Sequence, residues 1–270
     1  FFTVFFCFNN FVNAYFFGVI SENYTCINIQ FINIIFLKTI YKIKVIWKRI
    51  MHVTLKNLLK INKNVNTNLQ NEAKISVVPK IIAVSKTFKI DHIMPLINHG
   101  HQDYGENKVQ EAIEKWTKIK KENKNIKLHL IGGLQTNKVK NAVQLFDYIH
   151  SLDSKKLADK ICYQQKEQNI ERKIFIQVNL GKEEQKSGIP EEELLDFYKY
   201  CINLNLNIIG LMCIPPFNQD STKYFSRMQE LNKKIGLKEL SMGMSGDYLN
   251  AIKYGSTFVR IGSDIFGQRY

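Results

Sequence analysis

Two groups of residues in this sequence could bind a small molecule and react with it. The first is Lys86, which directly follows the apolar segment 80–85 (KIIAVS). A lysine at the end of an apolar strand is poorly solvated, which lowers its pKa and favours the neutral amine that forms an imine with an aldehyde. The competing interpretation is an ordinary surface lysine at the start of a loop, since the chain has 38 Lys and Arg residues.

The second group consists of small and hydroxyl-bearing residues near the C-terminus. Ser241 opens the segment SMGMS (241–245), and Gly262 and Ser263 follow the β-rich segment 256–261. Turns of this composition, next to a helix N-terminus, offer backbone N–H groups and hydroxyls to a phosphate. Combined with Lys86, they indicate a site for a phosphorylated aldehyde.

These residues need a scaffold, and the hydrophobic pattern supplies one. Eight short segments of strand character alternate with amphipathic helical segments: 80–85, 101–105, 128–134, 148–152, 173–180, 208–214, 239–244 and 256–261. This alternation predicts parallel strands joined by helices, and the count of eight predicts a single (β/α)8 TIM barrel. A doubly wound open sheet is the alternative, although no G-x-G-x-x-G or P-loop motif follows the first strand. In a barrel, residues that follow the strands gather at one end.

The first fifty residues differ from the rest of the chain. They hold 10 of the 18 Phe, and residues 1–20 carry no charge, but three Asn in that stretch argue against a membrane span. The first Met is Met51. The segment is either a targeting or anchoring extension or a stretch outside the real protein. We therefore expect residues 1–50 to be a non-family extension and residues 51–270 to form the barrel domain, without a membrane segment.

Composition narrows the class of protein. The chain is 45% hydrophobic and 23% charged, which is typical of globular proteins. Its five Cys form no C-x-x-C pair, which favours free thiols in a reducing, cytoplasmic compartment and no metal site. The net charge of +14 would suit a nucleic acid, but the basic residues are scattered, so we expect no nucleic-acid partner.

Seven ordered segments of the chain form a recognisable series: AVSKT (83–87), GENKVQE (105–111), HLIGGLQTNKVK (129–140), IQVNLGKEEQKSGI (176–189), GLMCIPP (210–216), LSMGMSGDY (240–248) and GSTFVRIGSDIFGQR (255–269). Together they resemble the YggS/PROSC family of pyridoxal 5′-phosphate (PLP) binding proteins. The resemblance covers roughly residues 55–269. It implies a barrel of the alanine racemase N-terminal type, in agreement with the strand count.

The resemblance also implies roles for individual residues. Lys86 forms the Schiff base with PLP, Arg260 faces the pyridine nitrogen and Asn107 lines the cofactor pocket. Three further residues hold the phosphate: Ser241, Gly262 and Ser263. Lys186 takes part in handling the cofactor. One departure is Phe88, which stands where family members often carry a second lysine.

Arg260 constrains the chemistry of such a site. A guanidinium keeps its protons, so the pyridine nitrogen stays unprotonated and the ring is a weak electron sink, which disfavours transamination. Racemisation would need a second acid/base group, which alanine racemase takes from another domain, and residues 51–270 leave no room for one. We therefore expect a monomeric protein of PLP (vitamin B6) homeostasis without established turnover, with PLP-dependent apo-enzymes as candidate recipients. A small PLP-dependent amino-acid racemase is the alternative.

Overall fold

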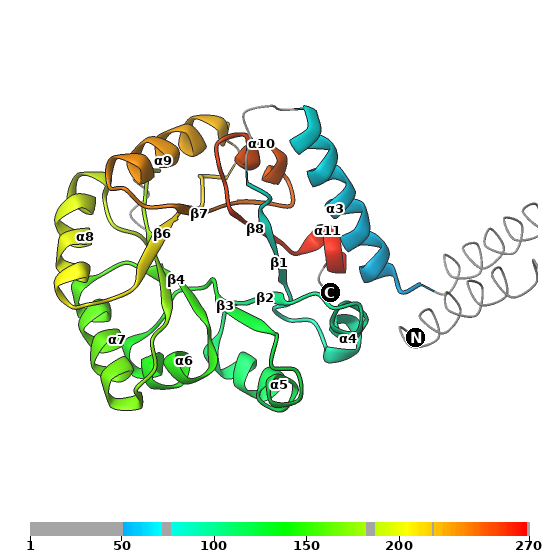
Figure 1. The fold of residues 1–270 in the computed structure, drawn as a ribbon, viewed down its shortest axis with the longest axis horizontal. Coiled ribbons are helices and arrows are strands. Elements are labelled where there is room, and N and C mark those ends of the chain that lie inside the picture. Colours follow the sequence, from blue (N-terminus) through cyan, green and yellow to red (C-terminus); the bar gives the residue numbers. More distant parts are fainter. Residues whose placement is uncertain (1–50, 72–76, 182–186, 218, 269–270) are drawn as a thin grey trace, which may run out of the picture. The chain divides into compact units, whose positions relative to one another are not determined.

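The computed structural model describes residues 51–71, 77–181, 187–217 and 219–268, which form a closed parallel barrel surrounded by helices (Figure 1). The strand order is β1-β2-β3-β4-β5-β6-β7-β8, and β8 pairs with β1 to close the barrel. The predicted (β/α)8 barrel is therefore confirmed. Residues 1–50 and Lys186 lie outside the described residues.

Each predicted strand is present, although several are shorter than expected. The strands are β1 (Lys80–Val84), β2 (Asp103–Glu106), β3 (Lys127–Leu130), β4 (Tyr148–Leu152), β5 (Lys173–Gln177), β6 (Ile208–Met212), β7 (Glu239–Met244) and β8 (Phe258–Ile261). The predictions 128–134 and 208–214 extend too far because apolar residues continue beyond the last paired residue. Ile131 and Ile214 belong to these extensions, and they line a cavity at the barrel mouth.

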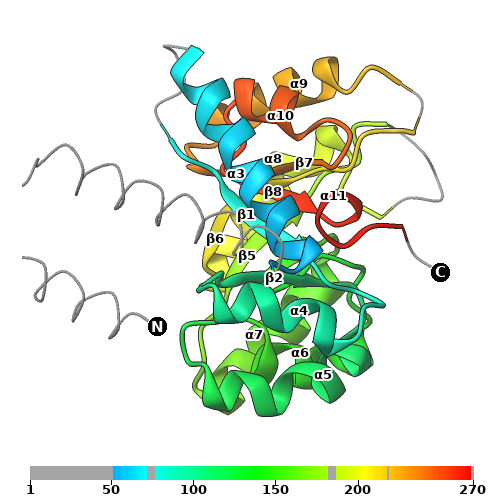
Figure 2. The ribbon, with the colours of Figure 1, turned by 90° about the vertical axis from the view of Figure 1, so that its right-hand side faces the viewer.

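Helices connect successive strands and cover the outside of the barrel. They are α3 (Val53–Asn71), α4 (Ile90–Asn98), α5 (Val109–Glu122), α6 (Val139–Leu145), α7 (Lys155–Gln168), α8 (Leu194–Asn203), α9 (Thr222–Lys234), α10 (Tyr248–Lys253) and α11 (Ser263–Phe266). Short 3₁₀ turns, η1 (Thr136–Lys138) and η2 (Glu191–Glu193), begin the segments that contain α6 and α8. The helix α3 lies beside α11 in both views (Figures 1 and 2), where Asn57 Nδ2 donates to the Ile265 carbonyl at 3.0 Å.

Two hydrophobic cores stabilise this arrangement. The larger one lies between the barrel and its helices and includes the fully buried Trp116, Phe146 and Phe225. The smaller one consists of Ile82, Val84, Tyr148, Phe175, Met212 and Phe258, from five different strands. Successive residues of a strand face opposite sides, so only alternate positions can enter this second core.

A glycine makes room beside the smaller core. A Cβ at Gly105 in β2 would lie 2.9 Å from Ile82 Cγ2 and 3.1 Å from Ile131 Cδ1. Both distances are shorter than ordinary carbon contacts, so a larger residue would push apart β1 and the segment after β3. These two segments carry residues of the candidate site.

Two further features concern the described ranges as a whole. The cysteines there, Cys162, Cys201 and Cys213, are buried and free. None of the helices in these ranges combines the length and the apolar character that crossing a membrane requires.

Candidate functional site

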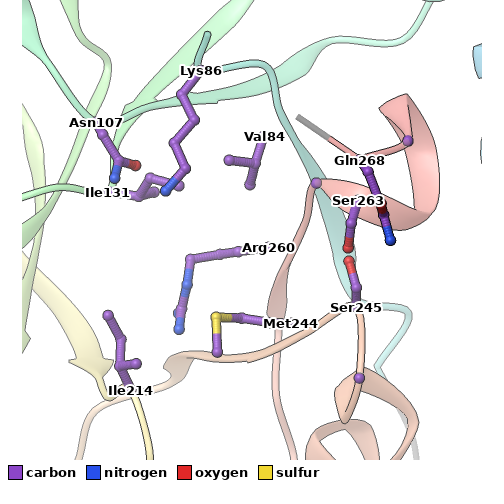
Figure 3. A pocket seen from close by; sticks show the side chains of 13 residues that line it. Val84, Lys86, Asn107, Ile131, Ile214, Met244, Ser245, Arg260, Ser263 and Gln268 are labelled. Carbon is purple, nitrogen blue, oxygen red and sulfur yellow. The ribbon is translucent and has the colours of Figure 1, made fainter. Parts of the chain in front are cut away.

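A cavity of about 590 Å³ lies at the carboxyl ends of the strands (Figure 3). Its lining comes mainly from residues that end or follow strands: Val84, Lys86, Asn107, Ile131, Ile214, Met244, Ser245, Gly246, Arg260, Gly262, Ser263, Gly267 and Gln268. Five of the seven residues that the sequence singled out are brought together here: Lys86, Asn107, Arg260, Gly262 and Ser263. Ser241 is not part of the lining, and Lys186 lies outside the described residues.

The half-buried Lys86 is held by the residues on either side of it. On one side, Lys115 Nζ donates to the Ser85 carbonyl at 2.9 Å. On the other, the Thr87 N–H donates to Glu111 Oε1 at 2.6 Å, and Thr87 has a left-handed φ of +68°. A β-branched residue rarely adopts this conformation, so the surrounding contacts must maintain it. The loop therefore holds the Lys86 backbone in one place at the edge of the cavity.

The contacts around Lys86 converge on one buried carboxylate. Glu106, at the end of β2, is fully buried. Its Oε1 accepts hydrogen bonds from Ser85 Oγ at 2.8 Å, from Lys115 Nζ at 3.0 Å and from Trp116 Nε1 at 3.0 Å. A buried carboxylate is costly unless donors and a counter-ion satisfy it; here all three donors bind Oε1, and the buried Oε2 has no partner among the described residues. The ends of β1 and β2 are thereby tied to α5.

Asn107 contributes an unused hydrogen-bond acceptor. Its Oδ1 atom is buried and has no partner among the described residues, although its side chain lines the cavity. Buried polar atoms are nearly always paired, so this oxygen is suited to a donor on a bound molecule. The backbone of Asn107 is itself closely packed, because a Cβ at Gly132 would lie 2.4 Å from its carbonyl oxygen.

Arg260 is the buried cation of the cavity. It is 4% exposed, and its Nη1 donates to the Ser241 carbonyl at 2.6 Å and to Ser241 Oγ at 2.7 Å. Its Nη2 donates to the Cys213 carbonyl at 2.8 Å. Burial lowers the pKa of Arg260, but a guanidinium titrates so far above neutrality that it keeps its charge. All three acceptors are neutral oxygens, so these contacts orient the guanidinium without cancelling its charge.

The thiol of Cys213 lies close to this arginine but is unreactive as a nucleophile. Burial raises the pKa of Cys213 to about 12. A thiol with such a pKa carries almost no thiolate at neutral pH and is a poor nucleophile. The role of this residue at the site is to supply its backbone carbonyl to Arg260.

Ser241 lies beneath Arg260, and another serine takes its expected place at the cavity. Ser241 is the third residue of β7 and is fully buried. Ser245 and Gly246, which directly follow β7, line the cavity instead. The signal that distinguishes the two serines is their distance from the strand end, because only residues at or beyond that end reach the barrel mouth.

Ser245 and Ser263 form a hydroxyl-rich end of the cavity. Figure 3 shows their side chains pointing toward one another. Ser245 Oγ also accepts the Asp264 N–H at 3.3 Å, which joins the loop after β7 to α11. The Ile265 and Phe266 N–H groups donate to the Gly262 carbonyl at 3.0 and 2.9 Å, so the two hydroxyls are the side-chain donors of this end. This end of the cavity has the chemistry expected for an anion such as phosphate.

Phe88 connects the Lys86 loop to this hydroxyl-rich end. Its ring stacks on Phe266 with centroids 5.0 Å apart and an interplanar angle of 27°. The contact joins the segment after β1 to α11 through apolar surface, where a lysine would bring a charge. A role for a second lysine at this position therefore does not apply to this chain.

The donor set as a whole fits a phosphorylated aromatic aldehyde. The cavity offers a primary amine, a fixed guanidinium, an unpaired amide oxygen and a hydroxyl-rich anion site. Its volume of about 590 Å³ lies within the range of about 300–1,000 Å³ that is usual for small-molecule pockets. Apolar side chains, among them Val84, Ile131 and Ile214, complete walls that could enclose a flat ring.

Known proteins resemble this chain over most of its length. Residues 57–270 match the family described as the N-terminal domain of alanine racemase. A pyridoxal phosphate homeostasis protein of Aquifex aeolicus is 40% identical over 200 residues, which cover 70% of this chain and 87% of that protein.

Solved structures show the same fold. The structure of PipY from Synechococcus elongatus with PLP bound has a TM-score of 0.67 and 31% identity, and the match covers 76% of this chain and all of PipY. An alanine racemase of Clostridium difficile has a TM-score of 0.57 at 16% identity, and the match covers 78% of this chain but 56% of that racemase. This chain belongs to the family of pyridoxal phosphate homeostasis proteins, whose barrel is that of the alanine racemase N-terminal domain.

Proposed function

We propose that this chain binds PLP covalently through Lys86 and serves in PLP homeostasis. The observation that carries the proposal is the placement of three groups around one cavity (Figure 3): the Lys86 amine, the Arg260 guanidinium and the hydroxyl-rich end. Names of relatives and the PLP-bound structure of PipY support the choice of cofactor. When bound, PLP supplies an aldehyde carbon that condenses with primary amines and a ring that can accept electron density.

Each lining residue then has a task that follows from its chemistry. Ser245, Ser263 and the backbone at Gly262 bind the phosphate through hydroxyls and N–H groups. Arg260 donates a hydrogen bond toward the pyridine nitrogen and, because it keeps its proton, leaves that nitrogen unprotonated. Asn107 supplies an acceptor beside Lys86. Ser241 acts on the cofactor only through Arg260.

The proposed role is binding, without catalytic turnover. An unprotonated pyridine limits the ring as an electron sink, and racemisation needs a second acid/base group on the opposite face. The cavity lining holds no Tyr, His, Cys, Asp or Glu among the described residues, so Lys86 is its proton-transfer group there. We propose a monomer that buffers PLP or passes it to PLP-dependent apo-enzymes, with Lys186 as a further residue that handles the cofactor.

The covalent assignment is tested by a PLP titration followed by borohydride reduction and peptide mapping. Reduction should trap the cofactor on Lys86 in the unaltered chain. The variant Lys86→Ala should lose the visible absorbance of the covalently bound cofactor and keep weak binding through the phosphate. The matched control is Lys89→Ala, since Lys89 is an exposed lysine three residues further on. Trapping on Lys89 or Lys186, with Lys86 unmodified, would refute the assignment.

A racemase is the second candidate, and chiral detection separates the two. The purified protein, saturated with PLP, would be incubated with L-alanine, L-serine and other amino acids. We expect no sustained appearance of the D-enantiomers above a protein-free PLP control. Turnover that disappears in Lys86→Ala would replace the proposed binding role with an enzymatic one.

A further inference from the structure

A chain of buried side chains crosses the barrel interior and ends at Arg260. Asp103 Oδ1, at the start of β2, lies 3.0 Å from His129 Nε2 in β3. His129 Nδ1 lies 3.0 Å from His150 Nε2 in β4. His150 Nδ1 lies 2.9 Å from Ser241 Oγ in β7, which accepts Arg260 Nη1–H at 2.7 Å. Five strands thus contribute one side chain each to a continuous series of hydrogen bonds.

Asp103 and the neutral state of the buried His129 determine the direction of every hydrogen bond in the chain. A carboxylate only accepts, so His129 donates to Asp103 from Nε2, and a neutral ring that donates at Nε2 accepts at Nδ1. His150 therefore donates from Nε2 and accepts at Nδ1, which requires Ser241 to donate its hydroxyl proton to His150. The lone pairs of Ser241 Oγ are then available to Arg260, which only donates. Both neutral imidazoles are consequently Nε2–H tautomers.

Burial and packing support this assignment. His129, His150 and Ser241 are fully buried, and Asp103 has an 18% exposed side chain. Burial lowers the pKa of His129 and holds that of His150 well below its ordinary value, which favours neutral rings. Burial by itself raises the pKa of Asp103, but the hydrogen bond and charge interactions with His129 outweigh burial. The pKa of Asp103 is therefore lowered, which favours the carboxylate.

Aromatic neighbours prevent the two imidazoles from turning over. The His129 ring stacks on Tyr148 with centroids 4.3 Å apart and a 10° interplanar angle. The His150 ring stacks on Phe175 with centroids 4.3 Å apart and an 18° angle. Stacked rings in a close-packed interior cannot rotate without displacing their neighbours. The nitrogen that faces each partner is therefore set by packing as well as by hydrogen bonding.

We propose that Asp103, His129, His150 and Ser241 are positioning residues that form a one-directional hydrogen-bond chain and orient Arg260 toward the bound ligand. The tautomer of His150 directs the Ser241 hydroxyl proton to His150 and leaves both lone pairs of Ser241 Oγ for Arg260, and Asp103 selects that tautomer from the opposite end of the chain. The expected effect on PLP affinity rests on the proposed function, whereas the orientation of Arg260 does not depend on any cofactor.

The first test is nuclear magnetic resonance of the full-length protein at pH 7 without added PLP. Histidine labelled with ¹⁵N should show Nε2–H tautomers for His129 and His150, and a ¹⁵N–¹⁵N coupling across the hydrogen bond between them. Arginine labelled with ¹⁵N should show Arg260 guanidinium protons in slow exchange with water. A cationic ring or an Nδ1–H tautomer at either histidine would overturn the proposal.

The second test uses His150→Phe, which keeps an aromatic ring but removes the acceptor for Ser241. Arg260 should then lose its slow exchange, and PLP affinity should fall about tenfold, the loss of one hydrogen bond of moderate strength. His150→Gln should recover part of the affinity because its amide oxygen can accept from Ser241. The control Tyr148→Phe, two residues away on β4, removes one hydroxyl but keeps the ring that stacks on His129 and every hydrogen bond of the chain.

The outcomes separate this inference from the proposed function. If the unaltered protein binds no PLP, the proposed function fails, and Arg260 exchange in His150→Phe still decides the inference. If PLP binds but His150→Phe and Tyr148→Phe behave alike in affinity and in Arg260 exchange, the inference fails and the proposed function stands. Should His150→Phe not fold, Ser241→Ala takes its place, with the same expected loss of slow exchange at Arg260.

Discussion

Lys115 Nζ donates a hydrogen bond to the carbonyl oxygen of Ser85 at 2.9 Å, and Ser85 is the residue directly before Lys86. The same ammonium contacts Glu106 Oε1 at 3.0 Å and Glu111 Oε1 at 2.9 Å. A side chain of α5 thus reaches the end of β1 and neutralises the buried carboxylate at the end of β2. The position of the candidate imine lysine depends on an ion pair that does not itself touch the cavity.

Replacing Lys115 with Met should therefore weaken both the fold and the site. The Glu106 carboxylate would remain fully buried without its cationic partner, which costs about 3–5 kcal/mol of unfolding free energy. PLP affinity should also fall, because the Ser85 carbonyl is no longer held. Urea denaturation and PLP titration measure the two effects, with the exposed Lys118→Met on the same helix as control. Equal stability of the two variants would contradict the prediction.

Removing either hydroxyl at the hydroxyl-rich end should weaken PLP binding and leave covalent attachment intact. A hydrogen bond to a charged group contributes about 1.5–3 kcal/mol, so Ser245→Ala and Ser263→Ala should each raise the dissociation constant roughly tenfold to a hundredfold. Borohydride trapping on Lys86 should persist at saturating PLP. Ser221→Ala, at the start of α9 and outside the cavity lining, is the control. An unchanged dissociation constant in both site variants would show that phosphate binds elsewhere.

Buried histidines should make the protein less stable as the pH falls below neutrality. Their lowered pKa values mean that His129 and His150 stay neutral when folded, whereas histidines in an unfolded chain titrate near pH 6.5, about the ordinary value. Below that pH the unfolded state binds more protons, so the unfolding free energy falls by up to about 1.4 kcal/mol per pH unit for each histidine. Well above that pH, the two histidines bind no extra protons in the unfolded chain, so the unfolding free energy keeps its full value.

The measurement for this pH effect is urea denaturation at pH 5, 6 and 7. His150→Phe should show a flatter pH dependence than the unaltered protein, because one proton-binding group is gone. Tyr148→Phe, which removes no imidazole from the same layer, should keep the original slope. Identical slopes for all three proteins would mean that His150 binds protons equally in the folded and unfolded states.

A chain that begins at Met51 should fold and bind PLP as well as the full chain does. All the strands and helices described here, and the family match over residues 57–270, lie beyond this point. Circular dichroism, thermal unfolding and PLP titration of the two lengths would test this. Failure of the shorter chain alone to fold would show that residues 1–50 belong to the folded domain.

The sequence alone identified the barrel and much of the site because these depend on local patterns. Strand and helix periodicities are visible within windows of a few residues, and the eight strands followed from them. Lys86, Gly262 and Ser263 each follow a strand closely, so the barrel rule placed them at one end, and the family resemblance added Asn107. The strand ends were less accurate, since apolar residues such as Ile131 continue past the last strand pair.

What the tertiary structure decided is which side chains meet inside the barrel. Ser241 and Ser245 look alike in the sequence, but strand pairing buries the first beneath Arg260 and leaves the second at the cavity. Likewise, His129 pairs with Gly105 in register, which turns its ring inward to meet His150. A shift of one residue in either strand would turn these side chains to the opposite face, so their contacts depend on register among strands far apart in the chain.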